Sequence, residues 1–117
     1  MMATKIQRDE LKAKIERGDD FVLVDALNQQ HYERSHLPGA INVPYEYVDD
    51  AEEKLPDKDA EIVVYCMNAN CAASGEEARE LEQMGYSHVL HYAEGKQDWI
   101  EAGYPVESKR KSRLGGI

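Results

Sequence analysis

The sequence is poor in cysteine and lacks a long apolar run. Only two of its 117 residues are cysteines, Cys66 and Cys71. Two are too few for the disulfide framework of a small secreted protein, and a cytosolic pair this close is more often catalytic, redox-active or metal-binding. No apolar run reaches the ~18 residues of a membrane span, and the N-terminal segment is charged where a signal peptide needs an apolar centre. We therefore expect a soluble, cytoplasmic protein that does not enter a membrane.

Basic residues are also scarce over most of the chain. The net charge is −9, but residues 107–117 carry four basic groups and one acidic group, which leaves residues 1–106 at −12. An acidic body argues against a nucleic-acid groove, so no nucleic-acid partner is expected. The length suits one domain. We predict a single domain over residues 1–106, followed by a basic, flexible C-terminal tail over residues 107–117.

Short apolar runs alternate with amphipathic stretches along the chain. The pattern predicts strands at 21–25, 40–43, 61–65 and 88–92, and helical segments at 7–17, 29–35, 45–54 and 96–102. A further helix follows residue 73, because Ser74 and Glu77 have the spacing of a capping box and Gly85 ends the apolar pattern. This alternation predicts an α/β domain with a mainly parallel sheet and helices on both faces.

Cys66 directly follows the clearest predicted strand and precedes a predicted helix. Ligands of open α/β sheets bind beyond the carboxyl ends of the strands, so this position makes Cys66 a candidate functional residue. The amides and dipole of the following helix would stabilise a thiolate, which an unperturbed cysteine of pKa ~8.5 forms to only roughly 3% at pH 7. The alternative is that Cys66 is a small buried hydrophobe.

Three segments resemble the rhodanese, or sulfurtransferase, family. They are VDALNQQHYERSHLPGAINVP at 24–44, IVVYCMNANCAAS at 62–74 and AEGKQDWIEAGYPV at 93–106, in the family's order and spacing. The resemblance covers about residues 5–106. It implies a rhodanese-like fold, a five-stranded, mainly parallel sheet with helices on both faces, and it places Cys66 on the catalytic cysteine.

The resemblance also implies a chemistry that needs no cofactor. The family's cysteine takes a sulfane sulfur from a donor, holds it as a persulfide and passes it to a thiol or another nucleophile, which is covalent catalysis in two steps. The expected partners are therefore a small-molecule or protein persulfide as donor and a thiol as acceptor. The amides that cradle the anionic intermediate would come from the loop after the cysteine, namely Met67, Asn68, Ala69, Asn70 and Cys71.

The chain departs from family members that use thiosulfate well. Such members often carry arginine or lysine at the positions held here by Met67 and Cys71, and an arginine at the position of Leu27. No arginine or lysine lies between Lys58 and Arg79. A dianionic donor would lose charge-assisted hydrogen bonds of about 1.5–3 kcal/mol each, so thiosulfate is a poor match and a thiol persulfide a better one.

Cys71 leaves two further functions open. A disulfide with Cys66 requires Cα atoms about 4.4–6.8 Å apart, and such a pair would let Cys71 resolve a persulfide or act in a thiol-disulfide redox or sulfur-sensing module. Alternatively, Cys71 is an inert filler at the start of the helix. The remaining hypothesis is a non-catalytic, partner-binding domain on the same fold.

Other residues are predicted to support the site. Asp25 is expected to accept hydrogen bonds near the cysteine loop, and His36 to orient the turn at Pro38 and Gly39. A zinc site made of the two cysteines with His88 and His91 is not expected, because side chains three apart on a strand point to opposite faces. The sequence thus predicts no metal site.

Overall fold

The structure is a computed structural model, and it describes residues 4–108. Its elements alternate along the chain in the predicted manner. In order they are β1 (Thr4–Lys5), α1 (Arg8–Arg17), β2 (Val22–Asp25), α2 (Gln29–Arg34), β3 (Ile41–Asn42), the 3-10 helix η1 (Tyr45–Asp50), α3 (Ala51–Lys54), β4 (Glu61–Tyr65), α4 (Ala73–Gln83), β5 (His88–Tyr92) and α5 (Gly95–Glu101).

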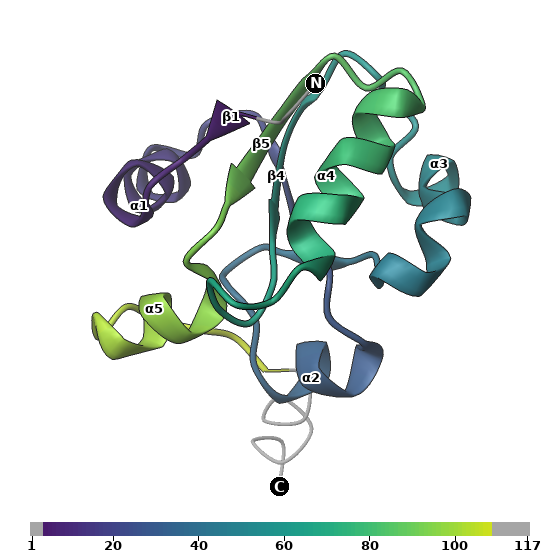
Figure 1. The fold of residues 1–117 in the computed structure, drawn as a ribbon. Coiled ribbons are helices and arrows are strands. Elements are labelled where there is room, and N and C mark those ends of the chain that lie inside the picture. Colours follow the sequence, from purple (N-terminus) through teal and green to yellow (C-terminus); the bar gives the residue numbers. More distant parts are fainter. Residues whose placement is uncertain (1–3, 109–117) are drawn as a thin grey trace, which may run out of the picture.

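The strands form one sheet in the order β1-β5-β4-β2-β3. Every pairing is parallel, and β4 lies in the centre with β2 and β5 on its two sides. The predicted five-stranded sheet of an α/β fold is therefore confirmed. Because the strands are parallel, their carboxyl ends meet at one edge, at the lower end of the molecule in Figure 1. The pattern of apolar runs missed β1, which has two residues, both exposed.

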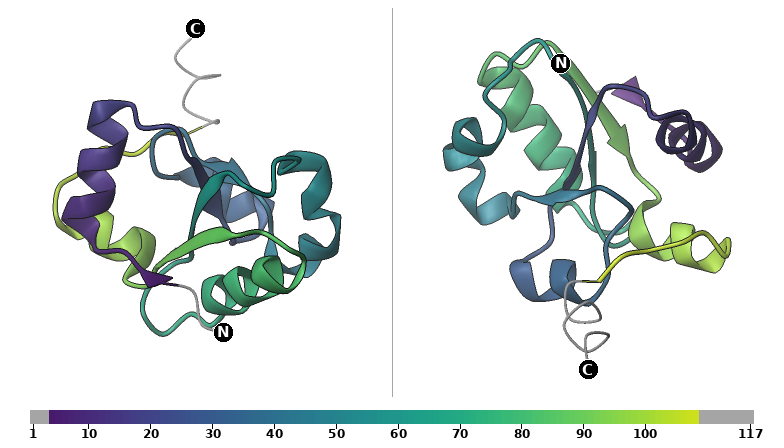
Figure 2. Two further views of the ribbon diagram at one scale, coloured as in Figure 1. Left: turned by 90° about the horizontal axis from the view of Figure 1, so that it is seen from above. Right: turned by 180° about the vertical axis from the view of Figure 1, so that it is seen from behind.

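Helices cover both faces of the sheet (Figure 2). α1 and α5 lie on one face, and α4 lies on the other with η1 and α3. Alternate side chains of β4 point to the two opposite faces of the sheet, as the geometry of a strand requires. Ile62 and Val64 belong to the apolar cluster under α4, whereas Val63 and Tyr65 belong to the cluster that contains Trp99 of α5.

Two local predictions differ from the structure. The helix expected over 45–54 consists of the 3-10 helix η1, which has a kink at Tyr47, and the short α-helix α3. The capping box predicted from Ser74 and Glu77 is wrong, because α4 already begins at Ala73 and no side chain caps it. Ser74 instead faces β5, where its Oγ lies 2.8 Å from Nε2 of His91, and Glu77 is buried against the sheet.

The segment after α5 returns to the body of the domain. Glu107 pairs with His36 through two backbone hydrogen bonds, and its carboxylate accepts a bond from the amide of Gly39. The hydroxyl of Ser108 donates to the carbonyl of Glu33 in α2. The predicted tail starts at Glu107, and its part from 109 to 117 lies outside the described residues. Over residues 4–108 no helix is long and apolar enough to cross a membrane.

A buried hydrogen-bonded chain joins the end of β2 to the end of β4. Asp25 and Tyr65 are opposite each other in the ladder, and the Tyr65 hydroxyl donates to the Asp25 carboxylate over 2.9 Å. The same hydroxyl accepts a bond of 3.0 Å from the amide of Leu37, and the second carboxylate oxygen accepts from the amide of Leu27. Burial raises the pKa of Asp25, and these bonds from Leu27 and Tyr65 oppose that rise.

We predict that Tyr65→Phe lowers the free energy of unfolding by about 1–3 kcal/mol, because it removes one hydroxyl that serves two buried groups. Urea denaturation measures the loss. The matched control is Tyr104→Phe, which removes the hydroxyl that bonds exposed Asp9, and its effect should stay within about 0.5 kcal/mol. Equal losses in the two variants would contradict the structural role of this chain of bonds.

Candidate active site

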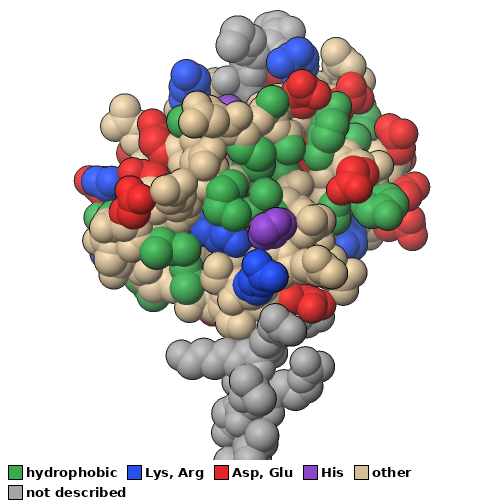
Figure 3. All heavy atoms as spheres, turned by 60° about the horizontal axis from the view of Figure 1, so that its bottom comes forward, with side chains coloured by type: hydrophobic (Ala, Val, Ile, Leu, Met, Phe, Trp, Pro, Cys, Tyr) green, Lys and Arg blue, Asp and Glu red, His purple; other side chains and the backbone are tan. Residues whose placement is uncertain are grey.

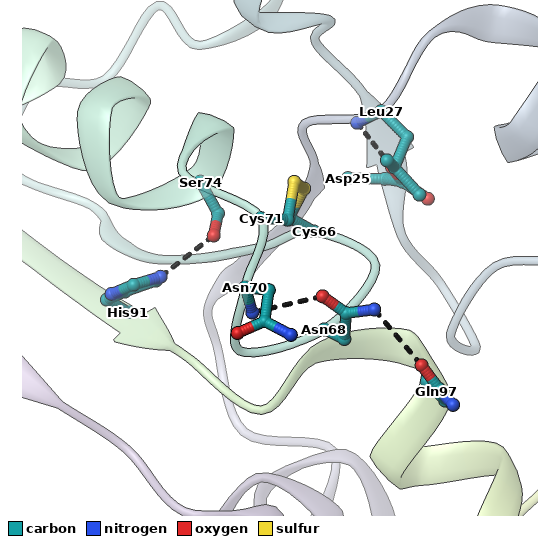
Figure 4. Close-up of a disulfide and its surroundings, with 9 residues drawn as sticks. All are labelled: Asp25, Leu27, Cys66, Asn68, Asn70, Cys71, Ser74, His91 and Gln97. Atoms are coloured by element: carbon teal, nitrogen blue, oxygen red, sulfur yellow. Dashed lines mark hydrogen bonds between the residues drawn. A yellow bond between two sulfur atoms is a disulfide. The ribbon is translucent and has the colours of Figure 1, made fainter.

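Cys66 lies at the carboxyl edge of the sheet, one residue beyond the central strand β4. The backbone there is held by β2, since the amide of Ala26 donates to the carbonyl of Tyr65 over 2.9 Å. Only 1% of Cys66 is exposed. Its sulfur lies between the start of α4 and the segment that follows Asp25 (Figure 4).

Cys66 and Cys71 form a disulfide (Figure 4). Their Cα atoms are 6.3 Å apart, so the five-residue separation does bring the two thiols within bonding reach. Cys71 is more exposed than Cys66, with an intermediate degree of burial. The structure is therefore the oxidised form of the site, in which the Cys66 sulfur is covered and already bonded.

The loop between the cysteines is ordered by its own polar groups. The amide of Cys71 donates to the carbonyl of Asn68, and the amide of Asn70 donates to the Asn68 side chain, each over 3.0 Å. The same Asn68 side chain donates to Gln97 of α5 over 3.1 Å (Figure 4). Of the five amides expected to form an anion cradle, those of Asn70 and Cys71 are thus used inside the loop. Those of Met67, Asn68 and Ala69 donate to no acceptor within residues 4–108.

The start of α5 holds the other side of the loop. The amides of Lys96 and Gln97 donate to the carbonyls of Cys66 and Met67, over 2.9 and 2.8 Å. Gly95 makes this contact possible, because a Cβ there would lie 2.7 Å from the Cys66 carbonyl oxygen, and its φ of 76° also favours glycine. Sequence reasoning missed this role, although the glycine of the AEGKQDW segment was its signal.

The structure places the predicted supporting residues in the framework around the site. Asp25 is bonded to Leu27 and Tyr65, as described above. His36 stacks on Tyr32, with ring centroids 4.0 Å apart, and its Nδ1 lies 2.7 Å from the Tyr32 carbonyl oxygen. No hydrogen bond joins Asp25 or His36 to either cysteine within the described chain. Both side chains therefore secure the segments around the loop rather than the sulfur atoms.

Lys96 is a buried cation that the sequence did not single out. Its side chain is 4% exposed, and its ammonium donates to the carbonyls of His31 and Ser35. Burial lowers the pKa of Lys96, and the charge of Asp25 opposes that effect. Since its ammonium is held by two carbonyls, Lys96 ties α5 to the α2 region.

Glu76 and Glu77 are neighbours in α4 and have different surroundings. Glu76 is exposed. Glu77 is fully buried, and neither of its carboxyl oxygens has a hydrogen-bond partner in residues 4–108. Burial, with a smaller contribution from the charge of Asp25, raises the pKa of Glu77 to about 9. Glu77 is therefore neutral at pH 7.

The two histidines considered for a zinc site, His88 and His91, have different surroundings. His88 is exposed, and His91 is bonded to Ser74 of α4. Figure 3 shows hydrophobic side chains, a histidine and several Lys and Arg side chains near the middle of the surface at the carboxyl edge, with acidic side chains mostly toward its rim.

The domain is thus a parallel α/β sheet with a cysteine loop at the end of its central strand. The model of the rhodanese-like domain family matches residues 7–102. The chain therefore belongs to the rhodanese-like family, as its three segments indicated. Sulfurtransferases are among its relatives, which supports a sulfurtransferase-type function at the level of the family.

Similar proteins differ in what surrounds the matching domain. The chain is 36% identical to the HTH-type transcriptional regulator Rv0324 of Mycobacterium tuberculosis, over 87% of this chain and 44% of the regulator. It is 27% identical to a sulfurtransferase of Allochromatium vinosum, over 90% of this chain and 95% of that protein. It is 30% identical to the thiosulfate:glutathione sulfurtransferase of Saccharomyces cerevisiae, over 81% of this chain and 76% of that protein. The chain thus spans less than half of the regulator and nearly all of the bacterial sulfurtransferase.

Solved structures have the same fold. The BH2092 protein of Bacillus halodurans superposes with a TM-score of 0.84 at 24% identity, covering 92% of this chain and 78% of that one. The Alr3790 protein of Anabaena superposes with a TM-score of 0.80 at 28% identity, covering 95% and 98%.

We predict that Gly95→Ala displaces the cysteine loop. The added methyl group would collide with the backbone of Cys66, Met67 and Asn68, and overpacking of this kind costs about 1–3 kcal/mol beyond the backbone cost of a positive φ. The control is Gly103→Ala, which has a φ of 82° and nothing within 4 Å of the added carbon. Urea denaturation and the alkylation rate of reduced Cys66 should both change more in the Gly95 variant. A smaller change there than at Gly103 would contradict the close contact.

We also predict that Glu77 makes the free energy of unfolding depend on pH. Its folded-state pKa lies above the unfolded value of 4.5, so the folded protein keeps a proton that the unfolded chain releases. This group should therefore lower the free energy of unfolding as pH rises from about 5 to 9, by roughly 1.4 kcal/mol per pH unit.

Urea denaturation of Glu77→Gln tests this expectation, because the amide does not titrate. The variant should lose the fall in stability between pH 5 and pH 8. Glu76→Gln makes the same change from a carboxyl group to an amide at an exposed position and should keep the wild-type slope. Parallel slopes in wild type and Glu77→Gln would show that Glu77 is not the titrating group.

Proposed function

We propose that this domain carries a sulfane sulfur as a persulfide on Cys66 and passes it to a thiol. The position of Cys66 carries the proposal, since it lies at the carboxyl edge of the sheet inside a loop whose backbone is fixed by α5. The amides of Met67, Asn68 and Ala69 are the donors that remain for an anionic intermediate. Membership of a sulfurtransferase family supports the same chemistry.

The transfer consists of two balanced substitutions. In the first, the Cys66 thiolate attacks the outer sulfur of a donor persulfide, RSSH, forming the Cys66 persulfide and releasing the donor thiolate, RS⁻. In the second, an acceptor thiolate attacks that outer sulfur and regenerates the Cys66 thiolate. The reduced protein is the form that reacts, so the Cys66–Cys71 disulfide must first be opened by a thiol.

A persulfide of a thiol suits the loop better than thiosulfate does. The segment from residue 59 to residue 78 contains no arginine or lysine. Lys96 follows Gly95 at the loop, but its ammonium is already bonded to two carbonyls. Each absent charge-assisted hydrogen bond costs a dianion about 1.5–3 kcal/mol, which corresponds to about 10- to 100-fold in rate or affinity.

The disulfide supports a second candidate function, thiol-disulfide redox chemistry or sulfur sensing. In that function the two thiols give up two electrons and two protons to a disulfide or peroxide oxidant and form the bond seen here. Cys71 would also resolve a persulfide, because its thiolate can attack Cys66 Sγ and release hydrosulfide. Both candidates use Cys66, and they differ in whether Cys71 is required.

Intact mass spectrometry of the freshly reduced protein tests the first candidate. Glutathione persulfide should add one sulfur atom at least about 10-fold faster than thiosulfate, for the electrostatic reason given above. Cys66→Ser should gain nothing, and Cys71→Ser should keep the added sulfur for longer than the wild type. A sulfur gain that persists in Cys66→Ser, or no gain from either donor, would refute persulfide formation on Cys66.

The same measurement with mild peroxide addresses the second candidate. A loss of two hydrogens that requires both cysteines supports the redox function. Stable oxidation of Cys66 to a sulfenic acid in the wild type, with no disulfide, would exclude it.

A further inference from the structure

The Asn68 side chain makes contacts that the expected anion cradle, which uses only backbone amides, does not explain. Its Oδ1 accepts the amide of Asn70 over 3.0 Å, and its Nδ2 donates to Oε1 of Gln97 in α5 over 3.1 Å. Its backbone carbonyl accepts the amide of Cys71 over 3.0 Å. Residues 68–71 therefore form a hydrogen-bonded turn. Asparagine is favoured at the first position of such a turn, because its side chain can accept the amide two residues on.

Asn70, the other asparagine of the loop, has no comparable contacts. Its side chain is exposed and makes no hydrogen bond within residues 4–108, whereas the half-buried side chain of Asn68 makes two. Figure 4 shows the Asn68 side chain joined to the backbone of Asn70 on one side and to Gln97 on the other. One side chain thus connects the loop both to itself and to α5.

The contacts of Asn68 act on the segment just before the second cysteine. Cys66 directly follows β4, and Cys71 lies two residues before α4 begins at Ala73, so each end of the loop adjoins a packed element. The Cα atoms of the two cysteines are 6.3 Å apart. The two amides that Asn68 holds are those of Asn70 and Cys71. They fix the backbone at Cys71, and with it the direction in which the Cys71 Cβ leaves the chain.

We propose that Asn68 is a positioning residue that holds Cys71 within reach of the Cys66 sulfur and thereby sets how readily the Cys66–Cys71 disulfide forms. When the disulfide opens, the turn still folds the chain back, so the effective concentration of the Cys71 thiol at Cys66 stays high. This role rests on the proposed function, in which the open Cys66 carries sulfur and Cys71 can resolve it.

The turn acts on the intramolecular step of disulfide exchange. The Cys66 thiolate attacks glutathione disulfide, GSSG, and forms a mixed disulfide with release of one GS⁻. The Cys71 thiolate then attacks Cys66 Sγ, the bond between Cys66 and glutathione breaks, and the second GS⁻ leaves. Two protein thiols are oxidised, GSSG is reduced, and the two protons end on the two glutathione thiols. Only the second step requires the cysteines to meet, so Asn68 affects that step.

The same geometry controls the lifetime of a persulfide on Cys66. A Cys71 thiolate held near Cys66 Sγ attacks it, releases hydrosulfide, HS⁻, and leaves the disulfide. A turn that favours this closure shortens the time in which the sulfur can pass to an outside thiol. Asn68 therefore sets the balance between sulfur transfer and thiol-disulfide chemistry at one site.

The test is the equilibrium of the cysteine pair with reduced and oxidised glutathione, measured by intact mass after the free thiols are alkylated. Asn68→Ala removes both side-chain bonds. Each net hydrogen bond changes an equilibrium by about 2- to 13-fold, so the equilibrium constant for disulfide formation should fall at least about 5-fold. The mixed disulfide with glutathione should also accumulate, because ring closure is slower. Circular dichroism confirms that the variant is folded.

Asn70→Ala is the matched control, because it is the same substitution in the same loop and removes no hydrogen bond of the described chain. Its equilibrium constant should stay within about 2-fold of the wild-type value. Asn68→Asp keeps an oxygen for the amide of Asn70 and should recover most of the loss. Gln97→Ala breaks the link to α5 but leaves the turn, so its fall should be smaller than that of Asn68→Ala.

A wild-type equilibrium constant in Asn68→Ala would overturn the role of Asn68. Equal falls in Asn68→Ala and Asn70→Ala, or no recovery in Asn68→Asp, would do the same. The glutathione equilibrium involves no sulfane sulfur, so it tests Asn68 independently of persulfide formation. Sulfur uptake by the reduced protein is measured separately by mass, and an added sulfur should persist longer in Asn68→Ala than in the wild type. Absence of uptake in the wild type would count against the persulfide alone.

Discussion

The parallel pairing of β4 with β2 and β5 is the constraint on which the rest of the structure depends. It aligns the carboxyl ends of the three central strands, so the residues that follow them meet at one edge. The pairing sets Tyr65 opposite Asp25, and the hydroxyl between them then fixes the amide of Leu37. It also brings the end of β5, and with it Gly95, against the backbone after Cys66. A change of register by one residue would turn Cys66 toward the wrong layer of helices.

Much of this arrangement is predictable from the sequence. The apolar runs at 61–65 and 88–92 correspond to β4 and β5 as the structure has them, because buried central strands need continuous apolar residues. The position of Cys66 follows from the end of β4. The rhodanese-like family followed from three motifs, since each of them contains residues that the cysteine loop or its supports require.

Other features depend on tertiary contacts that a local pattern does not contain. β1 is too short to have an apolar period, and its pairing with β5 creates it. Ser74 and Glu77 have the spacing of a capping box, but the helix begins two residues earlier than a capping Ser74 would start it, and both side chains are buried. The sequence left open whether the cysteines are within reach of each other, because that distance depends on how Asn68 folds the loop. The unpartnered state of Glu77 is likewise a property of the packed layers.

The contact between Ser108 and α2 has a consequence for how such a domain can be joined to others. Ser108 is held against Glu33, at the end of the molecule where the strands finish and the cysteine loop lies (Figure 1). A segment joined after this residue would start at the end of the molecule where the cysteine loop lies rather than at the opposite pole. A short linker would then hold such a segment at high effective concentration near the loop.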